Sequence, residues 1–249
     1  MKIWGFVTLL IGIAVLVAPM IGSFGTQLGI WPFFIGIQVF TYATGLAIFG
    51  CVTGLIGLLV SWVRKREISV KRNFLIGTLG SGVLVAYLVF VVIPGLQMPM
   101  LYNVSTDLVN PPSFSQEVLE VRGESNPVDM TDGIKDKVRA GYPQLKPYVT
   151  ELSIEEMVKI VEAAIDDFGW ETHGHQTDDD QPEVVTYYAT ATTFWFRFKD
   201  DIAIRIRPSE SGGSVVDVHS VSRVGISDLG KNAARIESFV EELDNRMSS

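Results

Sequence analysis

Residues 3–63 read IWGFVTLLIGIAVLVAPMIGSFGTQLGIWPFFIGIQVFTYATGLAIFGCVTGLIGLLVSWV, without a single Asp, Glu, Lys, Arg or His. As a helix this run would extend roughly 90 Å, enough for about two bilayer crossings joined by a turn. A second uncharged run, residues 73–97, is long enough for one more crossing. A soluble enzyme and a disordered chain are therefore excluded. The sequence predicts a membrane region over residues 1–96, with three transmembrane helices near residues 3–21, 36–62 and 74–93.

Small residues recur in these predicted helices, among them Gly50 and Gly54 in the second and Gly77 and Gly80 in the third. Such residues let helix backbones approach closely, either within one bundle or between subunits. Packing within a three-helix bundle is the simpler interpretation.

Basic residues predict the orientation of these helices. The segment from Arg64 to Arg72 carries five basic residues in nine, whereas the loop near residues 22–32 carries none. Because cytoplasmic loops are enriched in Lys and Arg, this segment and the N-terminus are predicted to be cytoplasmic. Three crossings then place residues 97–249 in the periplasm, and the predicted location is the bacterial inner (plasma) membrane.

The charge of the chain, −8 in total, is divided unevenly. Residues 1–96 hold six basic residues and one acidic residue, whereas residues 97–249 hold 14 basic and 27 acidic residues. An acidic outer half lacks the basic surface that nucleic acid requires, so the bilayer is the expected partner and nucleic acid is not. The predicted spans contain no ionisable side chain to mark an ion pathway. The single cysteine, Cys51, lies in the second span, so no disulfide is expected outside.

Turn-forming residues dominate residues 97–150, which are expected to form a tether and an irregular covering segment containing short helices or strands. Residues 151–249 predict an α+β outer domain. Ser153 and Glu156 form a capping box that opens a helix ending at Gly169. Strands are predicted near residues 170–175, 184–198, 201–207 and 214–221, with turns at 199–200 and 211–213 and a final helix over 229–247.

These elements predict the fold class: three transmembrane helices, followed by an antiparallel four-stranded sheet packed by two helices over one face. The clearest strand alternates Ile202, Ile204 and Ile206 with polar neighbours. In the last strand, Val216 and Val218 are expected inward, and Asp217 and His219 outward.

Three stretches of the outer half resemble a known family. They are residues 105–114 (STDLVNPPSF), 199–208 (KDDIAIRIRP) and 217–236 (DVHSVSRVGISDLGKNAARI). They are similar to the domain-of-unknown-function 1499 family of bacteria and plastid-bearing eukaryotes, over about residues 101–243. The resemblance implies a domain that often follows hydrophobic helices, and it implies no activity. His219 stands where the family's R-S-x-S-R run has its first arginine, so a ligand held by that arginine would be bound differently here.

The best candidate site surrounds residues 222–235. Ser227 or Asp228 can cap the final helix, and Asp228, Asn232 and Arg235 form one polar stripe on it. A helix N-terminus near arginines suits a carboxylate or phosphate. The alternative, which we favour, is that these groups lock the helix onto the sheet by buried hydrogen bonds. The candidate residues are Arg205, Arg207, His219, Ser222, Arg223, Ser227, Asp228, Asn232 and Arg235.

Other patterns have simpler interpretations. His173 and His175 near Asp178–Asp180 are residue types that bind metals, but a polar hairpin explains them, and no metal or other cofactor is expected. Asp200 and Asp201 could pair as catalytic carboxylates, but Asp200 is interpreted first as a turn residue. Tyr187, Tyr188 and residues 194–196 could line an apolar pocket, although sheet core and surface is the simpler explanation. Motifs of known nucleophiles are absent from the outer half.

The leading hypothesis is a non-enzymatic module, held in the membrane, whose outer domain binds an envelope protein or an anionic, amphiphilic or lipid-like ligand. One alternative is a periplasmic hydrolase or transferase centred on Asp201, His219, Ser222, Arg223 and Asp228. Another is a structural domain whose helices assemble a larger membrane complex. The sequence leaves enzymatic activity open and favours a protein without one.

Overall fold

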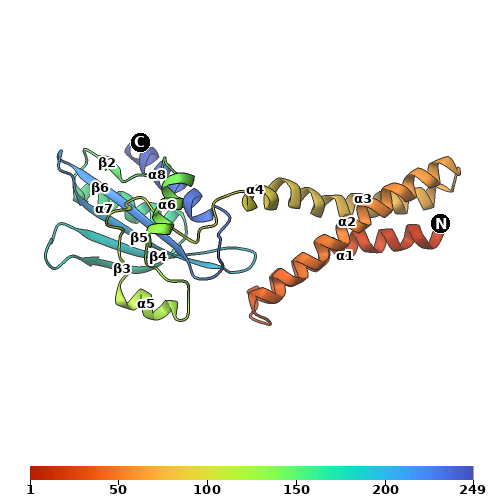
Figure 1. Cartoon of the computed structure of the whole chain (residues 1–249), viewed down its shortest axis with the longest axis horizontal. Helices are drawn as coiled ribbons and strands as arrows, with labels where there is room; N and C mark the ends of the chain where they lie inside the picture. The colour runs from red at the N-terminus through yellow and green to blue at the C-terminus, as the bar shows by residue number, and fades with distance from the viewer. Residues whose placement is uncertain (249) are drawn as a thin grey trace. The chain divides into compact units, whose positions relative to one another are not determined.

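A computed structural model describes residues 1–248, and the chain divides into two compact units (Figure 1). The first unit comprises residues 1–96 together with residues 194–197, and the second comprises the remainder.

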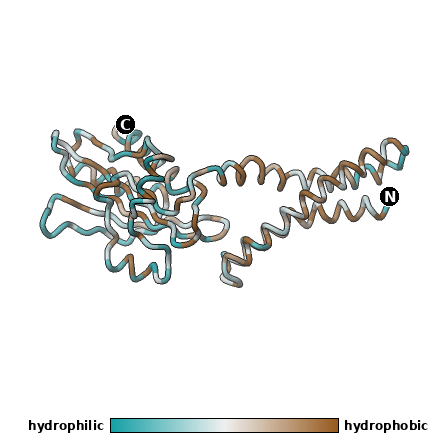
Figure 2. The backbone as a smooth tube through the Cα atoms, viewed as in Figure 1, coloured by the Kyte–Doolittle hydropathy of each residue, from teal (hydrophilic) through white to brown (hydrophobic). Residues whose placement is uncertain are grey.

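The first unit contains three long apolar helices. They are α1 (Lys2–Gln27), α2 (Phe33–Val63) and a third formed by α3 (Ile68–Tyr87), a π-helical turn η1 (Leu88–Val92) and α4 (Ile93–Leu96). Each is long and apolar enough to cross a membrane, as predicted, and Figure 2 shows how hydrophobic they are. The π-helical turn ends two residues before Pro94, whose ring nitrogen cannot donate a helical hydrogen bond.

Glycines allow the three helices to pack closely within this unit. A Cβ atom at Gly12 would lie 2.5 Å from the carbonyl oxygen of Gly77, and one at Gly77 would lie 2.2 Å from that of Thr8. Across the α2–α3 contact, Gly50 and Gly54 face Ser81 and Thr78. Packing within the bundle therefore explains these small residues.

The second unit is built on one antiparallel sheet of six strands, two more than predicted. Its order is β1-β6-β5-β4-β3, and β2 also pairs with β6. The two additional strands, β1 and β2, have three residues each, which is too short for an alternating pattern to reveal them. The strands are β1 (Asn103–Ser105), β2 (Tyr148–Thr150), β3 (Glu171–Thr177), β4 (Val185–Thr192), β5 (Lys199–Pro208) and β6 (Ser214–Ser222).

One side of the sheet, here called the isoleucine face, is apolar. It presents Ile202, Ile204 and Ile206 of β5 to the predicted pair of helices, α7 (Ile154–Asp167) and α8 (Lys231–Met247). Helix α6 (Asp132–Gly141) adds Val138 to the same core. The capping box of α7 is present as predicted.

The other side, here called the aspartate face, is also buried. It presents Asp201, Asp217 and His219 to the covering segment, which we define as residues 101–130 and which includes α5 (Gln116–Arg122). Figure 1 shows α5 and α8 on opposite sides of the sheet. The expectation that Asp217 and His219 face outward was therefore wrong, because the covering segment shields them from solvent.

Two predicted boundaries were also wrong. The turn between β4 and β5 is formed by residues 193–198, where the Thr193 amide donates to the Phe198 carbonyl oxygen at 2.8 Å. Asp200, predicted as a turn residue, is therefore a buried strand residue. Helix α8 begins at Lys231 because Leu229 and Gly230 adopt left-handed conformations, with φ of 56° and 82°.

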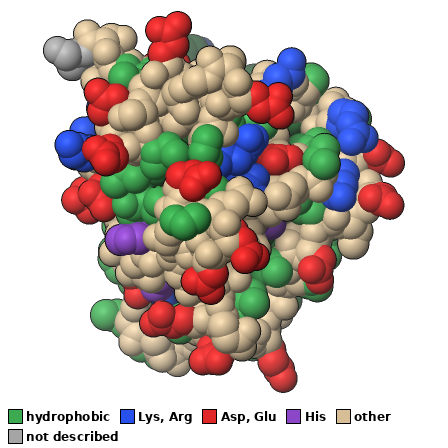
Figure 3. All heavy atoms as spheres, turned by 90° about the vertical axis from the view of Figure 1, so that its left-hand side faces the viewer, with side chains coloured by type: hydrophobic (Ala, Val, Ile, Leu, Met, Phe, Trp, Pro, Cys, Tyr) green, Lys and Arg blue, Asp and Glu red, His purple; other side chains and the backbone are tan. Residues whose placement is uncertain are grey.

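The turns at the opposite end of the sheet are strongly acidic. The β3–β4 turn contains Asp178, Asp179 and Asp180, and Glu210 lies in the β5–β6 turn. Figure 3 looks onto this end and shows acidic side chains over much of it.

Candidate functional site

Asp201 is the centre of one ionic cluster on the aspartate face, and its side chain is fully buried. Arg223 donates to both carboxylate oxygens, at 2.9 Å each, and Arg122 of α5 donates to Oδ2. Thr190 of β4 donates to Oδ1 at 2.6 Å. Burial alone would raise the pKa of Asp201, but the hydrogen bonds from Arg223 and Thr190 and the charge of Arg122 hold it below its ordinary value.

A second ionic cluster lies further along the same face. Asp217 accepts from Arg205 at 2.7 Å and from Arg207 at 2.8 Å. Arg205 also donates to the carboxylate of Asp107 and to the carbonyl oxygen of Asn110, at 3.0 and 2.8 Å. The hydrogen bond with Asp217 raises the pKa of Arg207. Through its bonds to Asp107 and Asn110, Arg205 holds the first turn of the covering segment.

His219 lies between the two clusters and is in contact with the same segment. Its Nδ1 lies 2.7 Å from the carbonyl oxygen of Pro112, and its Nε2 lies 2.7 Å from Oδ1 of Asn103. The amide nitrogen of Asn103 donates to the Val128 carbonyl oxygen at 2.9 Å, so oxygen acceptors face both ring nitrogens. Burial, aided by the charge of Arg122, nevertheless lowers the pKa of His219 to about 4.

On the isoleucine face, Asn232 connects α8 to the sheet. Its Nδ2 donates to Ser222 Oγ at 2.9 Å and to the Tyr102 carbonyl oxygen at 3.0 Å, and its Oδ1 accepts from Ser220 at 2.8 Å. One turn further along α8, Arg235 donates to Ser220 Oγ at 3.1 Å and to Asp200 Oδ2 at 2.5 Å. Side chains of β5 and β6, and the backbone just before β1, are thereby linked to the first turns of the helix.

Asp228 caps α8, one of the two predicted capping residues. Its Oδ1 accepts from the Gly230 amide at 2.8 Å and its Oδ2 from the Asn232 amide at 2.7 Å. Ser227 Oγ accepts from the Leu229 amide at 3.2 Å. Burial raises the pKa of Asp228 despite the two amide bonds. The helix N-terminus, which was a candidate anion site, is therefore occupied by a carboxylate of the chain itself.

A family comparison covers all of these clusters. The family model described as "Protein of unknown function (DUF1499)" matches residues 103–243, which is more than half of the chain. The chain belongs to the DUF1499 family. No curated protein and no solved structure is detectably similar to it. The match runs from the first residue of β1 into α8, so the DUF1499 domain includes the covering segment as well as the sheet.

The sheet of the DUF1499 domain divides the predicted site into two parts. Ser222, Asn232 and Arg235 belong to the isoleucine face, with Ser227 and Asp228 in the loop before α8. The alternative catalytic centre is divided in the same way, with Asp201 and His219 on one face and Ser222 on the other. Asp200 and Asp201 likewise point to opposite faces and do not form a carboxylate pair. The remaining candidates, Arg205, Arg207, His219 and Arg223, belong to the aspartate face.

Several residues of these clusters were missed in the sequence, above all Arg122, Asn103, Thr190 and Asp217. Arg122 lies in a stretch that the sequence predicts to be irregular. The sequence did contain a clue to the missing arginine: Asp201 and Asp217 each lie in a strand next to β-branched apolar residues, where burial is expected. A buried carboxylate requires donors, so each aspartate implied an arginine elsewhere in the DUF1499 domain.

The two histidines of β3 do not converge in the DUF1499 domain. The strand is irregular between Thr172 and His175, where Gly174 has a φ of 79°. His173 Nε2 therefore lies 2.7 Å from Thr190 Oγ1, on the aspartate face, whereas His175 lies against the Tyr187 ring on the isoleucine face. Over residues 1–248, the structure shows no group of three or more His, Cys, Asp or Glu residues placed to hold a metal ion.

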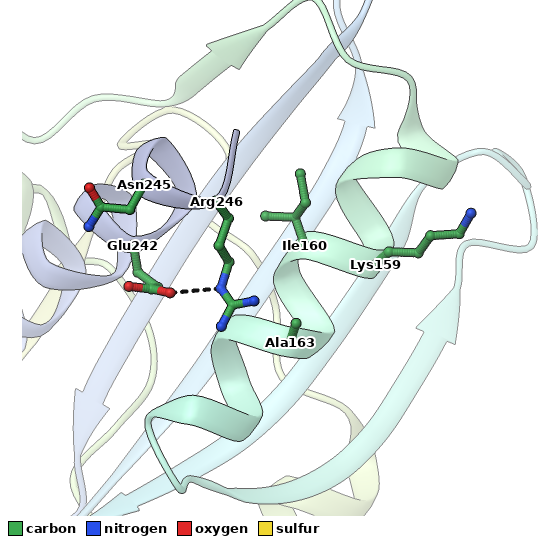
Figure 4. Close-up of a pocket in the computed structure, with 6 residues that line it drawn as sticks. All are labelled: Lys159, Ile160, Ala163, Glu242, Asn245 and Arg246. Carbon is green, nitrogen blue, oxygen red and sulfur yellow. Dashed lines mark ion pairs between the residues drawn. The ribbon is translucent and has the colours of Figure 1, made fainter. Parts of the chain in front are cut away.

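A shallow hollow of about 440 Å³ lies between α7 and α8 and was not predicted. Ile160 and Ala163 of α7 face Arg246 of α8, whose Nε lies 2.7 Å from Glu242 Oε1 (Figure 4). Arg246 also pairs with Asp167. The hollow mixes apolar and charged groups and includes none of the predicted site residues. Its lining consists of Lys159, Ile160, Ala163, Glu242, Asn245 and Arg246.

Proposed function

We propose that this chain is an inner-membrane protein whose periplasmic DUF1499 domain is a binding or assembly module for an envelope partner or an anionic or amphiphilic ligand. The observation that carries the proposal is that the polar side chains of the candidate site form hydrogen bonds to other parts of the same domain. Asp201 accepts from three side chains, and Asn232 connects α8 to β6 and to the residue before β1. The proposed role of this chemistry is to keep the domain rigid.

The same contacts argue for a structural role rather than a reaction at these residues. A catalytic nucleophile needs a base within hydrogen-bond reach and a place for the reacting atom. Ser222 Oγ is bonded to Asn232, and His219 lies between Pro112 and Asn103. A substrate would have to displace buried partners, each of which would then lack a hydrogen bond.

The partner surface we propose is the hollow between α7 and α8. Ile160 and Ala163 offer apolar contact there, and the Glu242–Arg246 pair offers charged groups at the rim. Recesses that combine apolar lining with a few polar groups are favoured for recognition. The periplasmic location is inferred from the basic residues between Arg64 and Arg72, which are expected to lie on the cytoplasmic side of the membrane. The third helix then crosses to the opposite side, where the DUF1499 domain follows.

Native mass spectrometry of the full-length protein, extracted from its own membranes, tests the binding role. The wild type is expected to carry a reproducible protein or ligand mass, which Ala163→Arg removes by filling the hollow. Ala140→Arg on α6 is the matched control, because it adds the same side chain at an exposed position outside the hollow. A wild-type protein that is always bare and monomeric would contradict the proposal. Retention of the bound mass in Ala163→Arg would contradict the choice of surface.

The proposed location has a separate test. Alkaline phosphatase fused after residue 249 is expected to be active, and a fluorescent protein that folds only in the cytoplasm is expected to be dark at the same position. The reverse pattern would place the DUF1499 domain in the cytoplasm.

A further inference from the structure

The turn between β4 and β5 displays aromatic side chains to solvent. The side chains of Phe194 and Trp195 are 66% and 48% exposed, and their rings meet edge to face at 5.3 Å. The turn is closed by the Thr193 amide donating to the Phe198 carbonyl oxygen at 2.8 Å, so it presents the two rings on an ordered support.

A second set of exposed apolar side chains lies where the chain leaves the third helix. Met98 and Met100 are exposed in the linker, residues 97–100, which follows the third helix. Ile226 and Leu229 are exposed in the loop before α8. The linker and this loop are neighbours: a Cβ atom at Gly230 would lie 3.1 Å from Met98 Cγ. The Asp228 amide also donates to the Leu101 carbonyl oxygen at 2.8 Å.

Both sets lie at the same end of the sheet. The aromatic turn leads into β5, whose Asp200 pairs with Ser222, and the loop containing Ile226 follows Ser222 directly. Met98 is two residues beyond Leu96, the last residue of the third helix, and two residues of chain span at most about 7 Å. This end of the sheet is therefore tied by the chain to the membrane exit, whereas the acidic turns lie at the other end.

We propose that this end of the DUF1499 domain inserts into the boundary between lipid headgroups and acyl chains of the bilayer. Aromatic rings with apolar neighbours favour this zone, and a helix already in the membrane keeps the surface at high local concentration. The contact is with lipid itself, and so it goes beyond the partner proposed for the α7–α8 hollow. The inserting residues are Met98, Met100, Phe194, Trp195, Ile226 and Leu229.

The test uses the full-length protein, with Cys51→Ser, reconstituted in vesicles of phosphatidylethanolamine and phosphatidylglycerol. A fluorophore is attached to a single cysteine at Phe194→Cys, Ile226→Cys or Val149→Cys, and lipids carry a spin label at a shallow acyl position. Val149 is the matched control, because it is an apolar residue, 59% exposed, paired with Val215 near the acidic end of the sheet. Quenching at positions 194 and 226 is expected to exceed that at 149 by about threefold.

Equal quenching at the three positions would overturn the proposal. Blue-shifted emission at position 194 without quenching by lipid would also overturn it, since this result indicates contact with protein. In a second measurement, Phe194→Ser combined with Trp195→Ser is expected to lower quenching at position 226 by about half. Both substituted side chains are exposed, so the domain is expected to fold, which circular dichroism checks. The experiment contains no envelope partner, so its result is independent of the proposed function.

Discussion

Both faces of the DUF1499 sheet are covered, but by different means. On the isoleucine face, Ile202, Ile204 and Ile206 pack against two amphipathic helices. On the aspartate face, Asp201 and Asp217 are equally buried, but each is held by arginines. Apolar packing dominates the first face, where Asn232 and the Arg235–Asp200 pair add polar bonds. On the second face, directed charge pairs hold the covering segment beside a smaller apolar cluster that includes its Phe114 and Val118.

The difference shows how an irregular segment can be fixed to a sheet. Apolar contact has no preferred direction, so it suits a regular helix whose apolar side chains already form one stripe. The covering segment forms no such continuous stripe. Phe114 and Val118 pack on the sheet, and Arg122, Asp107 and Asn103 add hydrogen bonds to specific partners. We infer that the buried charges determine where this segment lies. Four predictions test this contrast between the faces.

Asp201→Ala is expected to have the largest effect, about 3–5 kcal/mol of unfolding free energy, because it leaves Arg122 and Arg223 without their carboxylate. The loss should be greatest in the covering segment. The measurement is the thermal midpoint of the full-length protein in detergent, together with the rate of tryptic cleavage within residues 101–130.

Ile204→Ala is the matched control for Asp201→Ala, since Ile204 is a fully buried β5 residue on the opposite face. It should cost about 2–5 kcal/mol by opening a cavity. At temperatures where both variants are folded, cleavage of the covering segment should accelerate only in Asp201→Ala. Equal acceleration in the two variants would show that the charges do not fix the segment.

His219 predicts a pH dependence that belongs to the aspartate face alone. Its pKa of about 4 lies below the ordinary value of 6.5, so between these values the unfolded chain binds a proton that the folded chain does not. Stability is therefore fully present above pH 6.5 and falls as the pH decreases towards 4, by about 3 kcal/mol in total. The measurement is the thermal midpoint from pH 7 to pH 4.5 for the wild type and for His219→Gln, which cannot titrate.

Comparing the wild type with His219→Gln removes the pH dependence caused by the carboxylates, because both proteins contain the same ones. The stability advantage of the wild type over His219→Gln should shrink as the pH falls. If the advantage grows instead, the imidazolium donates to both Pro112 and Asn103, and the hydrogen bonds outweigh burial. The ring would then supply two donors, as the arginine of the family pattern would.

The sequence predicted the isoleucine face much better than the aspartate face. Ile202, Ile204 and Ile206 alternate within one strand, and the apolar positions of α7 and α8 repeat at helical spacing, so local patterns suffice. Asp201 is different, because its partner Arg122 lies 79 residues away and no periodicity connects them. Asp200 was assigned to a turn for the same reason: its partner Arg235 is on another element.

Short or irregular elements were lost for a separate reason. A strand of three residues, such as β1 or β2, cannot display alternation, and it exists because β6 offers it a hydrogen-bonding edge. The two histidines of β3 are two residues apart and would point the same way on a regular strand, but the irregularity at Gly174 reverses one of them. The membrane helices could be predicted without knowledge of tertiary contacts, because their length and lack of charge are sufficient to identify them.

Asp228→Ala is expected to have an intermediate effect, because it removes the cap of α8 while leaving both faces intact. It loses the bonds to the Gly230 and Asn232 amides, which should cost about 0.5–2 kcal/mol. Asp228→Ser, which retains one capping oxygen, should recover part of the loss. The thermal midpoints of the two variants provide the measurement. An Asp228→Ala protein as stable as the wild type would mean that burying the carboxylate costs as much as its bonds contribute.

Arg207→Ala is expected to have the smallest effect, at most about 1 kcal/mol. The Arg207 side chain is 33% exposed, and within residues 1–248 its one hydrogen-bonded partner is Asp217, which keeps its bonds to Arg205. Arg205→Ala is the comparison: that side chain is 11% exposed and also holds Asp107 and Asn110, so its loss should be larger and should loosen the covering segment. The thermal midpoints and the tryptic cleavage rates of the two variants measure this difference. The contrary result is an equal loss of unfolding free energy in the two variants with no faster cleavage in either. The bonds from Arg205 to the covering segment would then contribute nothing beyond neutralising Asp217. In that case the two faces would differ in chemistry but not in how they hold the segments packed on them.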